Sequence, residues 1–121
     1  MDREELKRRT KQFALRVIRL VESLPRNRTA EVLGRQLLRS GTSVEANYRA
    51  ACRAKSKADF ISKMGTVEEE ADESLYWMEL LVEAGIVKQE LLAPLMQEAD
   101  ELLAITVASI NTARRGKRIA K

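Results

Sequence analysis

The residues best suited to a chemical role are the arginines between positions 28 and 53. When this segment is drawn as one α-helix at about 100° per residue, their guanidinium groups fall within an arc of roughly 80°. We call this set the arginine row: Arg28, Arg35, Arg39, Arg49 and Arg53. The opposite face of the same helix carries apolar side chains: Leu33, Leu37, Val44, Tyr48 and Ala51. One face therefore suits packing, and the other presents fixed positive charge to phosphates or acidic partners.

The use of arginine rather than lysine at all these positions favours recognition of phosphate or carboxylate, because the planar guanidinium binds both anions in bidentate fashion. A solvated helix face, or a salt-bridge surface between subunits, explains the same pattern without any ligand, and both interpretations stay open. Further cations that extend the candidate binding surface lie on the first helix and near the end of the chain: Arg16, Arg19, Arg114, Arg115, Lys117 and Arg118.

Charge is segregated along the 121 residues. Residues 1–63 hold 16 Lys and Arg against 7 Asp and Glu, residues 64–111 hold 1 against 11, and residues 112–121 hold 5 against none. The net charge of +4 therefore hides blocks of opposite sign. Either these blocks neutralise each other within a bundle or between subunits, or one sign stays outward as a docking surface open to nucleic acid.

Composition excludes most familiar active sites. The chain has no histidine and a single cysteine, Cys52, so it can form no Cys–His pair, no zinc cluster and no internal disulfide. Di-metal centres in helix bundles require Glu-x-x-His pairs, which are absent here. We therefore expect no metal, no cofactor, no catalytic residue and no enzymatic activity. The apolar runs are too short to cross a bilayer and no secretory leader opens the chain, so we expect a cytoplasmic protein.

Hydrophobic spacing predicts four helices, over about residues 2–24, 28–54, 57–84 and 88–113, followed by a loose basic tail at 114–121. Pro25 ends the first helix, and Gly85 is a natural C-cap for the third. The third helix has the clearest start, because Ser56 and Asp59 resemble a capping box. Pro94 is expected in the first turn of the fourth helix or at its true start.

The second helix is predicted to be continuous, although Ser40 and Gly41 begin a stretch of small residues that weakens its middle by propensity. The apolar spacing stays in phase across this stretch, and small residues at mid-helix more often permit close helix approach than bind a ligand. Asn47 is expected to be a buried hydrogen-bonding residue that fixes register. A seam between helices or subunits is expected at three residues spaced by seven: Lys63, Glu70 and Trp77.

Helices joined by short connections predict an all-α, antiparallel up-down-up-down four-helix bundle over residues 1–113. Several large apolar residues do not fit the inward stripes, which indicates a second buried surface and hence a homo-oligomer. These residues are Leu15, Ile18, Leu38, Ile61, Tyr76 and Trp77.

A longer motif carries a resemblance to a known family. The run QLLRSGTSVEAN occupies residues 36–47, and further matching positions follow it: Tyr48, Ala54, Ser56, Asp59, Phe60, Lys63, Glu70, Glu73 and Trp77. With these residues the whole chain resembles the four-helix bundle proteins of the 23S ribosomal RNA intervening sequence family. The resemblance implies a left-handed bundle, a ring-like homopentamer and no enzymatic activity. It also implies kinship with the accessory variability protein of diversity-generating retroelements, which binds a reverse transcriptase and nucleic acid through its basic surface.

Two functions fit these observations. The first is a non-enzymatic, oligomeric accessory or scaffold protein that binds RNA or DNA phosphates without reading sequence. Base stacking should add little to such binding, because aromatic residues are few and mostly assigned to packing. The second function is a protein–protein adaptor whose basic face docks an acidic partner, with no role for nucleic acid.

Overall fold

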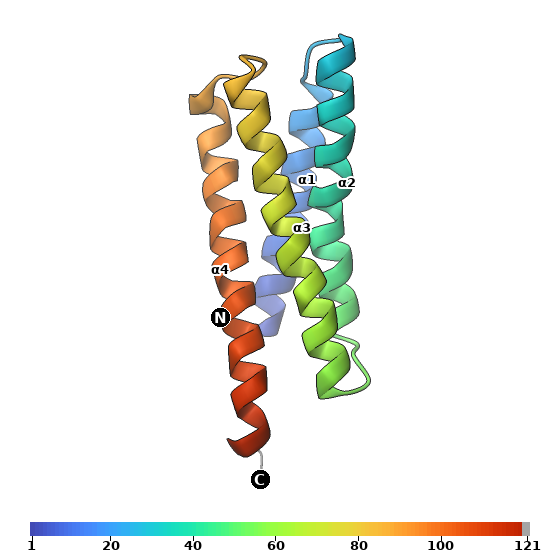
Figure 1. Cartoon of the computed structure of the whole chain (residues 1–121), viewed down its shortest axis with the longest axis vertical. Helices are drawn as coiled ribbons and strands as arrows, with labels where there is room; N and C mark the ends of the chain where they lie inside the picture. Colours follow the sequence, from blue (N-terminus) through green and yellow to red (C-terminus); the bar gives the residue numbers. More distant parts are fainter. Residues whose placement is uncertain (120–121) are drawn as a thin grey trace.

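The structure, a computed structural model, describes residues 1–119, with side chains described as far as Gly116. Its helices are α1 (Arg3–Glu22), α2 (Arg28–Ala51), α3 (Lys57–Glu83) and α4 (Gln89–Ile119), and no strand occurs in this part of the chain. The helices form an elongated bundle (Figure 1). The α1–α2 and α3–α4 connections lie at one end of it, and the α2–α3 connection lies at the other. The predicted all-α four-helix bundle is confirmed.

Polar side chains begin the first three helices. Asp2 accepts a hydrogen bond from the Glu5 backbone N–H at 2.8 Å, and Asn27 accepts one from Ala30 at 2.9 Å. Ser56 accepts one from the Asp59 N–H at 3.0 Å, as the capping-box pattern predicts. Each cap satisfies an N–H group that has no partner within its own helix.

Helix α2 runs unbroken through Gly41, and close packing explains why a glycine is there. A Cβ atom at position 41 would lie 2.8 Å from Val17 Cγ2 on α1, so only a residue without a side chain permits this approach. On the α3 side, the buried Ser74 hydroxyl donates to Ser40 Oγ at 3.1 Å. The small residues in the middle of α2 therefore let two neighbouring helices approach it closely.

The core is apolar along the length of the bundle, and its few buried hydroxyl groups are all satisfied. Phe13, Leu37, Met64 and Met78 are fully buried within it. The buried hydroxyls of Thr10, Ser40, Ser74 and Thr106 donate to backbone carbonyls of their own helices, at 2.7 to 3.3 Å. Among the described residues no buried side-chain polar atom lacks a hydrogen-bond partner. The core therefore holds no unsatisfied polar group that would suggest a missing ligand.

A charge-assisted contact joins α1 to α4. Arg9 donates to Glu98 at 2.6 and 2.9 Å and to Glu101 at 2.8 Å. The hydrogen bond with Glu98 is the main cause that raises the pKa of Arg9 above its ordinary value. The basic first half and the acidic second half of the chain thus meet directly inside one molecule, as one of the two interpretations of the charge blocks requires.

The structure corrects three predicted boundaries. Helix α4 continues to Ile119, so residues 114–119 are helical rather than a loose tail, whereas residues 120–121 lie outside the described part. Arginine and lysine are good helix formers, and their charge is favourable at a helix C-terminus. Helix α2 ends at Ala51 rather than near 54, which leaves Arg53 beyond its C-cap, Cys52. Pro94 is the sixth residue of α4, because the helix begins at Gln89.

Candidate nucleic-acid interface

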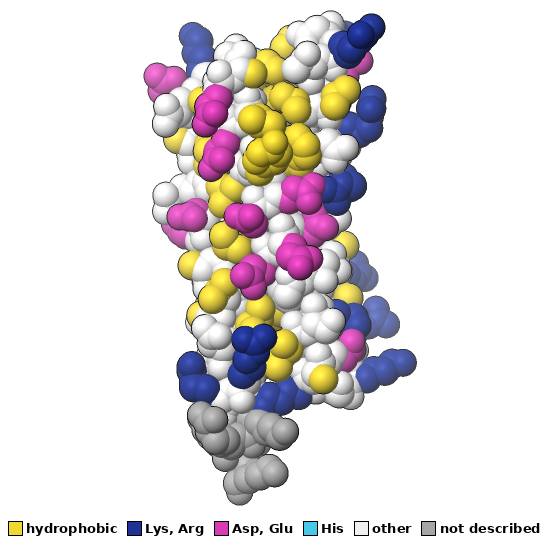
Figure 2. All heavy atoms as spheres, viewed as in Figure 1, with side chains coloured by type: hydrophobic (Ala, Val, Ile, Leu, Met, Phe, Trp, Pro, Cys, Tyr) yellow, Lys and Arg dark blue, Asp and Glu magenta, His cyan; other side chains and the backbone are white. Residues whose placement is uncertain are grey.

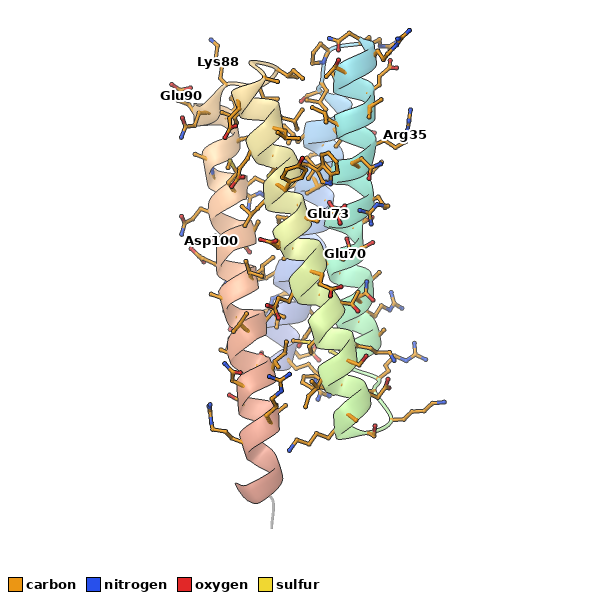
Figure 3. The ribbon with its side chains drawn as sticks, in the orientation of Figure 1. Arg35, Glu70, Glu73, Lys88, Glu90 and Asp100 are labelled. Carbon is orange, nitrogen blue, oxygen red and sulfur yellow. The ribbon has the colours of Figure 1, made fainter. Side chains whose placement is uncertain are left out.

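All five residues of the arginine row are exposed. Arg28, Arg35, Arg39 and Arg49 lie on the continuous helix α2, and Arg53 follows just beyond its end. Lys and Arg side chains follow the α2 edge of the molecule in Figure 2. In Figure 3, Arg35 points away from the bundle. The helix is not bent in a way that scatters the row, and the row is not buried within the chain.

Arg39 differs from the rest of the row because it is paired with acidic residues of α3. Its Nη1 lies 3.3 Å from Glu70 Oε1, and its Nη2 bonds Glu73. The indole N–H of Trp77 donates to the same Glu73 carboxylate at 3.1 Å. Glu70 and Glu73 lie on the side of α3 that faces α2 (Figure 3). Arg39 therefore joins two helices. Its positive charge is compensated by two carboxylates, so it is less available to an external anion than the other arginines of the row.

Two other residues predicted to have structural roles, Lys63 at the seam and Asn47 within the bundle, form contacts within their own helices. Lys63 Nζ bonds Asp59 Oδ1 at 2.6 Å, four residues earlier on α3. Asn47 is half-buried, and its amide donates to the Ser43 carbonyl at 2.8 Å within α2. The structure therefore differs from the prediction of a buried Asn47 that fixes register, because the side chain is half-buried and the hydrogen bond from its amide stays within α2.

The remaining arginines of the row have no neutralising partner in the part of the chain that the structure describes. Arg28, Arg35, Arg49 and Arg53 form no ion pair and no side-chain hydrogen bond with any described residue. On α1, Arg19 is exposed and Arg16 is half-buried. Guanidinium groups that are exposed and unpaired remain available to external anions.

Two grooves between α1 and α2 adjoin the row and reveal cations that the sequence analysis missed. The first, of about 340 Å³, is lined by apolar residues near Pro25 and by charged residues of both signs: Arg26, Arg35, Glu22 and Glu31. The second, of about 330 Å³, is lined by Lys7, Lys11 and Arg49 along with other residues. Lys7 and Lys11 are four residues apart on α1, a spacing that places them on one helix face and could have identified them.

A second cationic region forms where the α2–α3 connection meets the end of α4. Lys57 Nζ donates to the Arg114 carbonyl at 3.4 Å, which brings together residues far apart in the sequence. We call this region the basic end and define it as Arg53, Lys55, Lys57, Arg114 and Arg115. Lys and Arg side chains are visible at this end in Figure 2. Lys117 and Arg118 also belong to α4, but their side chains lie outside the described part.

Acidic residues gather on another face. In Figure 2, Asp and Glu side chains are concentrated over the middle and upper parts of α3 and α4. No group of three or more His, Cys, Asp or Glu side chains within the described residues is arranged to hold a metal ion. No described helix combines the length and apolar content needed to cross a bilayer.

Comparison with known families adds to this geometry. A sequence model described as the 23S rRNA-intervening sequence protein matches residues 4–108. The chain belongs to this family. The match includes nearly all of α1, all of α2 and α3 and most of α4, and it ends before the cationic residues from Arg114 onward. The region that matches the 23S rRNA-intervening sequence protein family therefore contains residues of all four helices of the bundle.

A solved structure supports the assignment. It is a crystal structure of a protein of unknown function from the S23 ribosomal protein family of Bacteroides thetaiotaomicron, with 34% sequence identity and a TM-score of 0.87. The similarity covers 93% of this chain and 100% of that chain. Comparison with curated proteins gives no match. The family and the fold are thereby established.

Proposed function

We propose that this protein is a non-enzymatic, oligomeric scaffold that binds the phosphate backbone of RNA or DNA through unpaired arginines, without reading base sequence. The observation that carries the proposal is the continuity of α2, which keeps Arg28, Arg35 and Arg49 exposed on one helix and free of acidic partners. At 1.5 Å per residue, Arg28 and Arg35 are about 10 Å apart along the helix axis, and Arg28 and Arg49 about 31 Å.

This spacing suits a polyanion rather than a single small anion. A duplex strand carries a phosphate about every 3.4 Å of axis, so a row of this length spans several phosphates. Exposed guanidinium groups bind phosphate oxygens through two parallel hydrogen bonds and release condensed counterions. Such contacts position a protein on nucleic acid but carry no base information, which is consistent with a scaffold.

Self-assembly is part of the proposed function, because large apolar side chains remain at the surface. Leu15 is 38% exposed, Val32 46% and Tyr76 50%. Burial of such side chains between copies would remove apolar area from water. The family resemblance implies a ring-like homopentamer. Native mass spectrometry tests this directly: a pentamer is expected, and a monomer at micromolar concentration would contradict the assembly while leaving phosphate binding to be judged separately.

From the same resemblance we propose a reverse transcriptase as the protein partner. The two proteins would bind each other and nucleic acid in the cytoplasm. Kinship with the accessory variability protein of diversity-generating retroelements motivates this partner. A reverse-transcriptase gene beside this one would support a retroelement role. A location within a ribosomal RNA operon, without such a gene, would remove the support for that partner and leave nucleic acid as the proposed ligand.

The test of nucleic-acid binding is a titration of the protein into a fluorescent RNA hairpin of unrelated sequence, at low and at physiological salt. Binding is expected at low salt and should weaken steeply as salt rises. The variant Arg28→Glu/Arg35→Glu/Arg49→Glu should bind much more weakly while keeping the helical content of the wild type. Absence of wild-type binding even at low salt would overturn the proposal and favour the adaptor function.

A charge-compensated variant separates a local site from an effect of net charge. It carries the same three changes together with Glu79→Lys, Glu83→Lys and Asp100→Lys, at exposed positions on the acidic face. This variant has the wild-type net charge, but its cations are displaced from the row. Affinity should stay below that of the wild type if the row contacts phosphate. Recovery of wild-type affinity would show that net charge, rather than the row, determines binding.

A further inference from the structure

We infer that the basic end is the principal phosphate-binding surface of the protein, and that a nucleic-acid backbone crosses the end of the bundle between the α2–α3 connection and the last turns of α4. This inference rests on the proposed function and names the part of the surface that dominates it. The occupant is nucleic acid, and its phosphates are the recognised groups.

Three segments converge at this end. The end of α2 leads into the connection that carries Arg53 and Lys55, and α3 begins at Lys57. Lys57 is tied to α4 by its hydrogen bond to the Arg114 carbonyl. Helix α4 continues past the level of the α2–α3 connection (Figure 1). Arg114 and Arg115 are therefore carried to the edge of the bundle on a helix, close to cations that precede them by more than fifty residues.

Charge is less compensated here than along the row. Apart from Lys57, which is bonded to the Arg114 carbonyl, residues 53–57 contain the cations Arg53 and Lys55 and no acidic residue, and residues 102–121 contain no Asp or Glu. Along α2, by contrast, Glu45 pairs with Lys11 at 3.5 Å, and Arg39 is held by two carboxylates of α3. A polyanion therefore meets a higher uncompensated charge at the basic end than along the row.

The acidic residue in the first turn of α3 is already occupied. Asp59 accepts hydrogen bonds from Lys63 Nζ at 2.6 Å and from the Lys55 backbone N–H at 3.1 Å. The bond from Lys63 is the main cause that lowers the pKa of Asp59, with the Lys55 amide second. Glu68 lines the same groove of about 230 Å³ as Arg114, but the two form no ion pair. The guanidinium groups of Arg114 and Arg115 thus keep their charge for an external ligand.

Part of this surface lies beyond the region that the family model matches, whereas Arg53, Lys55 and Lys57 lie within it. The family match ends at residue 108, so Arg114 and Arg115 lie beyond it. The extension of α4 gives them a defined position next to the α2–α3 connection, which a loose tail would not. A rigid arrangement of cations binds a polyanion at a lower entropic cost than a flexible one does.

The experiment compares two double variants that remove the same charge. Lys55→Gln/Arg115→Gln removes two positive charges from the basic end. Arg28→Gln/Arg35→Gln removes two positive charges from the row. All four side chains are exposed and form no ion pair with any residue that the structure describes, so both variants should keep wild-type helicity and urea midpoint. Each is titrated into the RNA hairpin over a series of salt concentrations.

The basic-end variant should lose about tenfold in affinity at low salt, and its slope of log affinity against log salt should flatten by about 1.8 if both cations contact phosphates of a duplex stem. The slope of the row variant should flatten by less than half as much as the slope of the basic-end variant. An equal or larger loss in the row variant would overturn this inference and leave the proposed function standing. Failure of the wild type to bind RNA at all would overturn both.

A competition experiment tests the commitment to nucleic acid. Polyglutamate supplies carboxylates without sugars or phosphates and is added at a charge concentration equal to that of the RNA. Weak competition is expected, because bidentate phosphate contacts distinguish the RNA. Competition as strong as that of unlabelled RNA would show a surface for acidic proteins and would overturn the inference.

Discussion

The middle of the α2–α3 seam and the basic end are both rich in polar and small residues, yet they are built differently. In the seam Arg39 contacts Glu70 and Glu73, and Ser40 contacts Ser74, while the adjacent Gly41 packs against α1 on the other side of α2. At the basic end, Lys55, Arg114 and Arg115 form no ion pair with a described residue, and a Cβ at the nearby Gly65 would meet no atom within 4 Å. Polar residues of similar types therefore join helices where a partner on the neighbouring helix faces them. Where no such partner faces them, they remain available to a ligand.

Glycine substitution should give the largest contrast between the two regions. Gly41→Leu places a side chain where even a Cβ would lie 2.8 Å from Val17, so it should lower the free energy of unfolding by about 1–3 kcal/mol or more through overpacking. Gly65→Ala meets open space on a helix and should raise it by about 0.5–1 kcal/mol. Urea denaturation measures both. Similar destabilisation by the two changes would contradict the difference in packing.

Serine substitution in the seam should also lower the free energy of unfolding, by less than Gly41→Leu does. Ser74→Ala removes a buried hydroxyl that bonds Ser40 and the Glu70 carbonyl, and should cost about 1 kcal/mol. Ser109→Ala is the matched control, because Ser109 is half-buried beside a groove and forms no side-chain hydrogen bond with a described residue. Its urea midpoint should stay near that of the wild type. Equal losses would show that the seam hydroxyl has no special role.

Removing the carboxylates that hold Arg39 should make the seam resemble the basic end. Glu70→Gln/Glu73→Gln frees the Arg39 side chain, which is already 47% exposed. Stability should fall by less than about 1 kcal/mol, because partly exposed ion pairs are screened by solvent. Affinity for the RNA hairpin should rise, since one more guanidinium is available and two negative charges are lost. Unchanged or weaker binding would show that pairing does not control the availability of arginines.

The smallest expected effect is a pH dependence at the basic end. The folded-state pKa of Asp59 is lowered below 3.8, chiefly by its hydrogen bond with Lys63. The stabilisation from this carboxylate is therefore fully present above its unfolded-state pKa and is lost as pH falls through the folded-state value. Asp59→Asn should lower stability slightly at neutral pH and lose less on acidification below pH 4. Parallel pH profiles of the two proteins, measured by urea midpoint, would contradict this assignment.

Much of the fold could be predicted from the sequence because the decisive signals are local. The capping side chains of Asp2, Asn27 and Ser56 identify three helix starts, and the in-phase apolar residues of α2 correctly predict continuity through Gly41. The end of α4 was missed because its last residues are basic and lack apolar spacing. Their helix propensity and favourable interaction with the helix C-terminus extend the helix regardless.

The candidate site could be predicted only in part, because it depends on which helices face each other and in what register. Periodicity placed all five arginines on one helix, and the structure keeps four of them exposed on α2, whereas Arg53 lies beyond its end. It could not show that Glu70 and Glu73 lie opposite Arg39, since that contact joins residues about thirty positions apart. It also could not bring Lys57 beside Arg114, so the lysines of the basic end were missed.

The most direct test of the whole account is the salt dependence of wild-type binding to an RNA hairpin. If unpaired arginines and lysines bind phosphates, log affinity falls linearly as log salt rises, with a slope of about −0.9 for each duplex phosphate contacted. Several contacts are expected, so the slope should be steeper than about −2. No binding at low salt, or an affinity that does not change with salt, would contradict the claim that these cations form a nucleic-acid interface.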